Sequence, residues 1–446
     1  MGPPESKVEA SRPGLSSRDA LGKAPRQGSL LTRHLKDWQI PLNSWPRKFV
    51  AIVLVLITGG ILIYRTWGMF LAAWMTRSKI PDPAIYERAI RYDPGNADYH
   101  FILGNIYNYS TQYLNISRAG EQYEAAVRLN PYASAYWLEL SKYYEQSRKI
   151  ERSVDAMKMA LQRDPNYAQT HWAAANFYIR LDDLKSADFE LRRTADLDVG
   201  YLTQALDLVW HFYEDPERIM STHVPNSKDA NLIALNYFIG QKNETGAGLA
   251  WSRLKAFTTS VPERFAYIDF LVSSGKPHDA WNVFSFPSGN TSSLIYNSSF
   301  ETEPMNGGFD WRFGSTEHAE ARRDTTTAQE GVASWLVTFD GKENVDYAAL
   351  SHWFPVTQGQ QYMLTFWMKT EGITTNEGVF MEVEGQASEK QMGTTYWRQF
   401  TIPFTASSNL ATLRLRRMPS KKFDNLLKGK VWLDNFGLTE VRKVRQ

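Results

Sequence analysis

One stretch of the chain is almost purely apolar. Residues Phe49 to Tyr64 read FVAIVLVLITGGILIY, sixteen residues without a charged side chain. As a helix they span about 24 Å, which is short for a hydrocarbon layer of about 30 Å. Continuing through Arg65 to Leu71 gives a sufficient length, because an arginine near the end of a span can extend its guanidinium to the interface. The pattern predicts one membrane-spanning helix at Phe49 to Leu71, within a membrane region at residues 48–74, with Trp67 and Trp74 at headgroup depth.

A cleaved signal peptide is the alternative for this stretch, but 48 residues precede it and no small-x-small cleavage site follows. Those preceding residues hold nine Lys and Arg among many Ser, Pro and Gly. We predict a disordered basic cytoplasmic tail at residues 1–47, which sets topology or, alternatively, binds anionic lipid. Four basic residues in the twenty positions before Phe49, against three in the twenty positions after Tyr64, favour an extracytoplasmic position for the rest of the chain.

A period in the sequence follows the apolar stretch. Pro94, Pro131 and Pro165 lie in short polar turns, 37 and 34 residues apart. The middle unit carries large and small residues in the order Trp137, Leu140, Ser141, Tyr144, Ser153, Met157, Ala160 and Pro165. This order and the period resemble the tetratricopeptide repeat, a pair of helices per unit. The resemblance covers residues 82–198 and implies a helical solenoid at residues 80–198.

Residues 199–287 continue with helical periodicity and looser repeats, for example at Ala280 and Phe284. We predict degenerate helical repeats that extend and cap the solenoid. A solenoid offers a concave groove, so the expected partner there is a protein or peptide. The alternative is that the helices only space the next domain from the membrane.

Helical periodicity stops at residues 287–290 (PSGN), and short β-rich runs replace it. The runs bounded by Gly, Asn, Thr or Pro are Ser334–Phe339, Ala348–Pro355, Gln361–Lys369, Gly378–Val383, Trp397–Phe404, Thr412–Arg416 and Lys430–Thr439. Seven strands in so short a segment predict an antiparallel β-sandwich at residues 291–441.

Three motifs in this segment stand in a defined order. They are Asn297–Glu301 (NSSFE) with Gly308–Trp311 (GFDW), Gly359–Thr370 (GQQYMLTFWMKT) and Val431–Phe436 (VWLDNF). Together they resemble a carbohydrate-binding module of the galactose-binding-like jelly-roll type. The resemblance implies a structural calcium ion held by the first and last strands, at Glu301 and Asp434. Calcium needs six to eight oxygens, and the alternative is that Asp434 belongs to a turn or an edge hydrogen-bond network.

A glycan site requires exposed aromatic faces beside polar side chains, because sugar rings present apolar C–H faces flanked by hydroxyls. The candidates near strand or loop boundaries are Trp311 with Arg312, Trp335, and Trp397 with Arg398. Core packing is the alternative for each of them. Trp353, Trp367 and Trp432 lie within apolar runs, so we expect them in the core.

The composition excludes several classes of binding and catalytic site. With 50 basic and 48 acidic residues the net charge is +2, so no global field favours nucleic acid, and the absence of Cys excludes disulfides and thiolate metal sites. No P-loop, dinucleotide fingerprint, metal-binding histidine motif or nucleophile elbow occurs, and we expect no enzyme.

The fold class is therefore multidomain α + β: one transmembrane helix, an α-helical solenoid and an antiparallel jelly roll. The expected function is an inner-membrane, extracytoplasmic scaffold of envelope polysaccharide synthesis, export or tethering, with no cofactor other than the calcium ion. Two alternatives are a protein-interaction adaptor whose sandwich binds no sugar and a carbohydrate-active enzyme.

Overall fold

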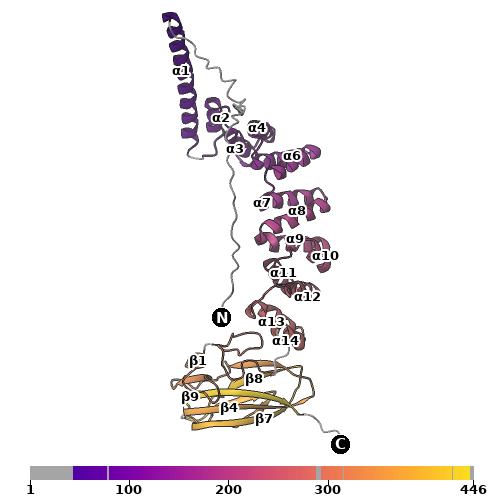
Figure 1. Cartoon of the computed structure of the whole chain (residues 1–446), viewed down its shortest axis with the longest axis vertical. Helices are drawn as coiled ribbons and strands as arrows, with labels where there is room; N and C mark the ends of the chain where they lie inside the picture. Colours follow the sequence, from indigo (N-terminus) through magenta and orange to yellow (C-terminus); the bar gives the residue numbers. More distant parts are fainter. Residues whose placement is uncertain (1–43, 78–79, 288–292, 315, 424, 442–446) are drawn as a thin grey trace, which may run out of the picture.

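The computed structural model describes residues 44–77, 80–287, 293–314, 316–423 and 425–441. Most of the tail predicted at residues 1–47 lies outside these residues. Three parts follow one another along the long axis: a long helix, a stack of helices, and two β-sheets (Figure 1). The predicted multidomain α + β fold is confirmed.

The apolar stretch forms α1 (Trp45–Thr76), which begins before and ends after the predicted span. Its apolar side chains are exposed from Phe49 to Phe70 except at a few positions, so the rest of the described chain does not cover this helix. Its last turns pack on α2 (Pro83–Tyr92), where Ala72 and Ala89 are fully buried. A Cβ at Gly68 would lie 2.8 Å from the carbonyl oxygen of Tyr92, so glycine is what allows this approach.

Pairs of antiparallel helices form the stack below α1. The repeats with the predicted pattern comprise α2, α3 (Ala97–Tyr109), α4 (Ile116–Leu129), α5 (Ser134–Gln146), α6 (Ile150–Arg163), α7 (Ala168–Arg180) and α8 (Leu184–Leu197). The looser part comprises η1 (Val199–Tyr201), α9 (Leu202–Tyr213), α10 (Pro216–Thr222), α11 (Lys228–Gly240), α12 (Glu244–Leu254), η2 (Pro262–Arg264), α13 (Phe265–Ser273) and α14 (Pro277–Phe284). The result is a tetratricopeptide-type solenoid that separates α1 from the sheets (Figure 1).

Small residues let the paired helices approach. Ser141 and Ser153 are buried where α5 meets α6, and each hydroxyl donates to the other residue's carbonyl oxygen, at 2.9 and 2.8 Å. Gly104 of α3 faces the ring of Tyr123, where a Cβ would lie 2.7 Å from a ring carbon. Small residues at these repeat positions therefore serve the packing of the helices, since a close-packed interior leaves no room for larger side chains.

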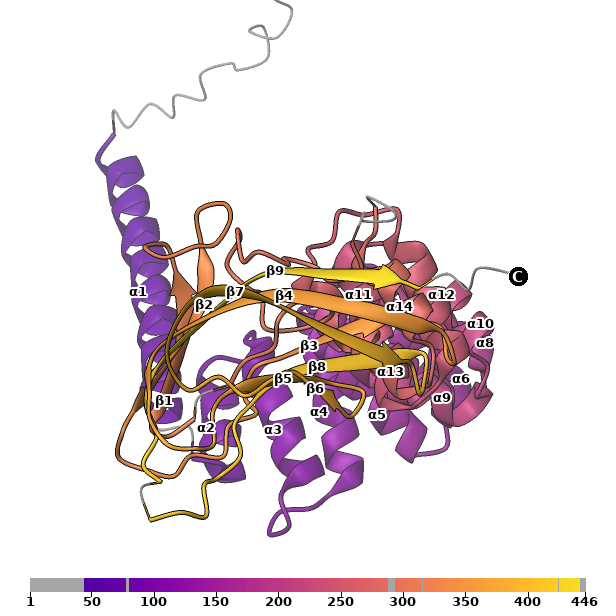
Figure 2. The same ribbon diagram turned by 90° about the horizontal axis from the view of Figure 1, so that it is seen from below.

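Two antiparallel sheets complete the chain. The strands are β1 (Ala319–Asp324), β2 (Ser334–Asp340), β3 (Ser351–Pro355), β4 (Gln361–Ile373), β5 (Phe380–Val383), β6 (Gln386–Ala387), β7 (Gly393–Thr405), β8 (Leu410–Arg416) and β9 (Lys428–Glu440). One sheet has the order β1-β2-β9-β4-β7 and the other β3-β8-β5-β6. In Figure 1, β4, β7 and β9 lie beyond β8 on the side away from the solenoid, and Figure 2 shows them with the helices behind.

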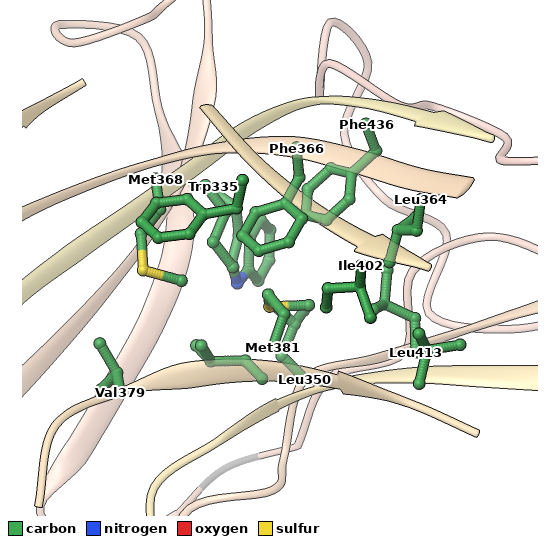
Figure 3. Close-up of a cluster of buried hydrophobic side chains, with 14 of the residues drawn as sticks. Trp335, Leu350, Leu364, Phe366, Met368, Val379, Met381, Ile402, Leu413 and Phe436 are labelled. Carbon is green, nitrogen blue, oxygen red and sulfur yellow. The ribbon is translucent and has the colours of Figure 1, made fainter. Parts of the chain in front are cut away.

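The core lies between the two sheets. Trp335, Phe366 and Phe436 from the five-stranded sheet face Met381 and Leu413 of the four-stranded sheet (Figure 3). Stacked sheets pack about 10 Å apart, which large interdigitating side chains fill. Each strand therefore has one face committed to this core and one face left outside.

The solenoid and the sandwich share an apolar interface. Phe309 and the partly buried Trp353 pack within the same cluster as Trp281 and Phe284 of α14. The buried side chain of Arg264 fixes the end of α14 and the residues after it, because it donates hydrogen bonds to the carbonyl oxygens of residues 283, 284 and 286. It also donates one to the carbonyl oxygen of residue 259. The two parts are thus joined by a core, which fixes the direction in which the five-stranded sheet faces.

Candidate functional site

The outer face of the five-stranded sheet is turned away from the solenoid (Figure 1). On β4 the side chains alternate: Leu364, Phe366 and Met368 are buried, while Thr365 and Trp367 are partly exposed. Since successive strand residues point to opposite faces, the second set belongs to the outer face. The expectation that Trp367 lies in the core is therefore wrong: it lies on the outer face.

Aromatic residues of β7 lie next to this row. The β4–β7 ladder pairs Met368 with Arg398 and Thr370 with Thr395, so two residues, Tyr396 and Trp397, oppose the single Lys369. This is a β-bulge, a feature that re-aims side chains. Tyr396 is 93% exposed and Trp397 partly exposed. Both belong to the outer face, because their flanking residues pair with the buried Met368 and Thr370.

A fourth aromatic residue of this face is Trp432 on β9, opposite Lys369. The ammonium of Lys369 lies 4.8 Å from the Trp432 ring centroid, and that of Lys430 lies 5.8 Å away. These cations cover the indole, which is 4% exposed, and cation–π attraction stabilises the arrangement. Trp432 therefore positions Lys369 on the surface and offers little ring area itself.

One carboxylate orients this indole. The Nε1–H of Trp432 donates to Asp324 Oδ2 at 2.8 Å. Burial acts to raise the pKa of Asp324, but the hydrogen bonds from Trp432 and Thr326 outweigh it and lower the pKa. Asp324 is thus charged at neutral pH and holds Trp432 in place.

We name the set Trp367, Lys369, Tyr396, Trp397 and Gln399 the outer aromatic face. Trp367 pairs with Gln399 across β4 and β7, and Trp397 stands two residues from Gln399. Diagonal neighbours in such a ladder lie about 7 to 8 Å apart. An extended ligand lying along the strands would therefore meet two or three aromatic side chains beside an ammonium and an amide.

Two predicted sugar platforms are buried instead. Trp311 is 0% exposed, donates Nε1–H to the carbonyl oxygen of Asn297 at 3.1 Å, and packs on Phe300 and Phe436. Trp335 is 1% exposed and points between the sheets in Figure 3. The prediction of a glycan contact is wrong for both, because core packing takes their rings out of solvent.

The two predicted arginines also have structural partners. Arg312 stacks on Trp353 at 3.6 Å and pairs with Asp269 of α13 at 2.7 Å, so it belongs to the contact between solenoid and sandwich. Arg398 pairs with Glu389 at 3.0 Å and lies over Phe400. Because Arg398 neighbours Trp397 in the strand, its side chain leaves on the opposite face, so the predicted pairing of the two is wrong.

The carboxylates of the two predicted calcium ligands accept hydrogen bonds from backbone N–H groups. Asp434, 0% exposed, accepts hydrogen bonds from the N–H groups of Gln329, Glu330 and Asn435 at 2.7, 3.2 and 2.7 Å. Glu301 accepts from Val332 N–H at 3.1 Å. A cation would face these N–H dipoles, so the residues do not fit calcium, and they match the alternative of a hydrogen-bond network.

The carboxyl of Asp434 is buried close to a second carboxylate, that of Glu301. Burial raises its pKa, and the nearby charge of Glu301 adds to the rise, while the backbone hydrogen bonds oppose it. Within the described ranges, no group of three or more His, Cys, Asp or Glu residues is placed to hold a metal.

The solenoid has a hollow between α4 and α6. Its volume is about 400 Å³, and Trp137, Leu140 and Tyr144 of α5 form its floor. Charged residues of both signs rim it: Glu124, Arg128, Arg152 and Asp155. An apolar floor with a charged rim suits a peptide segment.

No protein-family model matches the chain, and no curated protein sequence matches it. Solved structures are similar over parts of it. The module TmCBM61 in complex with β-1,4-galactotriose is 15% identical, covers 34% of this chain and 100% of its own, with a TM-score of 0.25. The MamA protein is 13% identical and covers 45% of this chain and 92% of its own, with a TM-score of 0.27.

A third structure, pilF of Pseudomonas aeruginosa, is 11% identical and covers 52% of this chain and 95% of its own, with a TM-score of 0.27. Identities this low concern the fold alone, and TM-scores this low carry no inference about function. The assignment of a repeat solenoid followed by a jelly-roll sandwich rests on the geometry of the chain itself.

Proposed function

We propose that the protein is a membrane-anchored stalk that presents a carbohydrate-binding face away from the membrane. The outer aromatic face is the observation that carries this proposal. Trp367, Tyr396 and Trp397 stand on an open sheet surface with Lys369 and Gln399 between them. Aromatic faces supply contact for sugar C–H groups, and the amide and ammonium supply donors for hydroxyl or carboxylate oxygens.

The anchor in this proposal is α1, which is 32 residues long and, over its most apolar part, unburied by the rest of the chain. A hydrocarbon layer of about 30 Å takes about 20 helical residues, which counted from Phe49 end at Gly68. The contact of Gly68 with Tyr92 supports this end, because α2 carries Arg88 and Arg91. The span then stops before the predicted Leu71. We place the helix in the inner membrane with the solenoid outside the cytoplasm.

Envelope polysaccharide is the ligand class that fits the arrangement. Figure 1 shows α1 and the sandwich at opposite ends, so the outer aromatic face would stand beyond the membrane surface. The solenoid would hold it there as a stalk, since an apolar interface rather than a linker joins the two. Synthesis, export or tethering of a glycan would all use such a face.

A glycan array tests this proposal. The full chain in detergent should bind at least one extended polysaccharide, and Trp397→Ala should weaken that binding about tenfold, which corresponds to ~1.4 kcal/mol. Tyr132→Ala, which removes a ring 74% exposed on the solenoid, is the matched control. If no polysaccharide is retained, the sandwich binds no sugar and the proposal fails.

A protein-interaction adaptor is the second candidate, favoured by the hollow between α4 and α6. Photo-crosslinking from Met159, which lines the hollow, should then capture a protein, while the same probe at Tyr396 should not. Glycan binding with no protein captured at Met159 would exclude the adaptor role for this hollow.

We propose no catalytic role. A glycoside hydrolase places two carboxyl groups across a cleft, and the pKa of the one that acts as general acid is raised. Among the described residues, Asp310 and Asp434 have a carboxyl pKa that burial raises, and both are fully buried with backbone N–H donors on them. Turnover of a polysaccharide that a single carboxylate substitution abolishes would contradict this part of the proposal.

A further inference from the structure

A pocket lies where α1 meets α2, outside the sites described above. Its volume is about 610 Å³, and it is lined by Trp74, Met75 and Arg77 of the α1 end and by Ile85 and Arg88 of α2. Two guanidinium groups thus face a hollow whose other walls are apolar. This combination fits an amphiphile with an anionic head.

The two arginines have no acidic partner among the described residues. The nearest acid along α2, Glu87, is engaged elsewhere: it accepts from Tyr107 at 2.7 Å and pairs with Arg118 at 3.7 Å. Asp82, at the start of α2, caps its own helix through Ala84 N–H. The pocket therefore carries net positive charge, which an anion would neutralise.

The position of the pocket along α1 points to the source of that anion. If the hydrocarbon ends near Gly68, the six residues to Trp74 add about 9 Å of helix. The headgroup layer on each side of a bilayer is about 5 to 8 Å thick. Trp74 and the pocket would then lie at the outer edge of the headgroup layer, within side-chain reach of the lipid phosphates.

We propose that this pocket binds the headgroup of an anionic phospholipid, with the phosphate between Arg77 and Arg88 and the glycerol and first acyl carbons against Trp74, Met75 and Ile85. The proposal rests on the membrane anchoring proposed above. The bound lipid would brace α1 against α2, so that the solenoid leaves the membrane in one direction.

Native mass spectrometry of the full chain released from nanodiscs tests the proposal. Nanodiscs contain phosphatidylcholine alone or mixed with phosphatidylglycerol. We expect one retained phosphatidylglycerol and a roughly fivefold loss of its occupancy in Arg88→Gln or Arg77→Gln, since each basic side chain contributes about that factor at an anionic surface. Arg91→Gln, which removes the same charge from the same helix outside the pocket, should retain the lipid.

Three outcomes would overturn the proposal. Equal retention of phosphatidylcholine would mean that the pocket does not select charge. Equal loss in Arg91→Gln would mean diffuse surface attraction, and displacement of the lipid by inorganic phosphate would mean a free-anion site. Anchoring is scored separately by resistance to carbonate extraction: a chain that resists extraction but retains no anionic lipid refutes the pocket alone, and a chain that is extracted refutes both.

Discussion

Acid should weaken the sandwich through one histidine. His352 of β3 is 0% exposed, with its ring 4.8 Å from that of Trp311, and its Nε2 lies 3.2 Å from the carbonyl oxygen of Tyr296, to which it donates. Burial lowers the pKa of His352 to about 4; the hydrogen bond to Tyr296 opposes this, and the charge of Arg312 adds to it.

The sign follows from proton binding in the two states. The unfolded imidazole takes up a proton below its ordinary pKa of 6.5, whereas the folded one stays neutral down to about 4. Between these values the unfolded state binds more protons, so the free energy of unfolding decreases as the pH falls. A shift of this size corresponds to about 3 kcal/mol by pH 4, at 1.36 kcal/mol per unit.

Urea unfolding of the full chain in detergent, followed by tryptophan fluorescence at pH 7, 5.5 and 4, measures this loss. His352→Phe keeps an aromatic ring without the titrating group and should lose about 3 kcal/mol less between pH 7 and pH 4. His318→Gln is the contrasting variant: Asp340 raises the pKa of His318, so this histidine stabilises the folded state as the pH falls, and its removal should not reduce the acid loss. Parallel profiles for wild type and His352→Phe would refute the reasoning.

Further predictions concern the contact between solenoid and sandwich, the hydrogen bonds of Asp434, and the contact between α1 and α2. Arg312→Ala removes the ion pair with Asp269 and should lower the free energy of unfolding by about 1 to 2 kcal/mol, as measured by denaturation. Asp434→Asn should lower the melting temperature, because it weakens the hydrogen bonds that Asp434 accepts. Excess calcium or EDTA should change the melting temperature of the wild type by no more than about 1 °C, and a larger change would show that calcium binds there. Gly68→Ala should speed hydrogen exchange in α2, whereas Gly59→Ala, with nothing within 4 Å of its Cβ, should not.

The repeats were readable from the sequence because their spacing reflects packing between neighbouring helices. Ser141 and Ala160, predicted at small positions, are both fully buried. Strands were readable for a related reason, since turn residues bound them. The sequence run Ser334–Phe339 corresponds to β2 within one residue.

The binding face was only partly readable. Alternation along β4 carried a usable signal, because Trp367 shares its parity with Thr365 and Lys369 rather than with Phe366. The burial of Trp311 could not be predicted from the sequence, since it depends on residues far apart in the chain, such as Asn297 in a loop and His352 in β3. Tyr396 was missed because a bulge, set by pairing with β4, places it on the surface.

Affinity electrophoresis tests the central claim most directly. The full chain would be run through gels containing neutral or acidic envelope polysaccharides, alongside Trp367→Ala with Tyr396→Ala and the Tyr132→Ala control. We predict that one polysaccharide retards the wild type and the control, and that the double variant migrates freely while its circular dichroism is unchanged. Retardation of the double variant equal to that of the wild type would show that the outer aromatic face is not where the glycan binds.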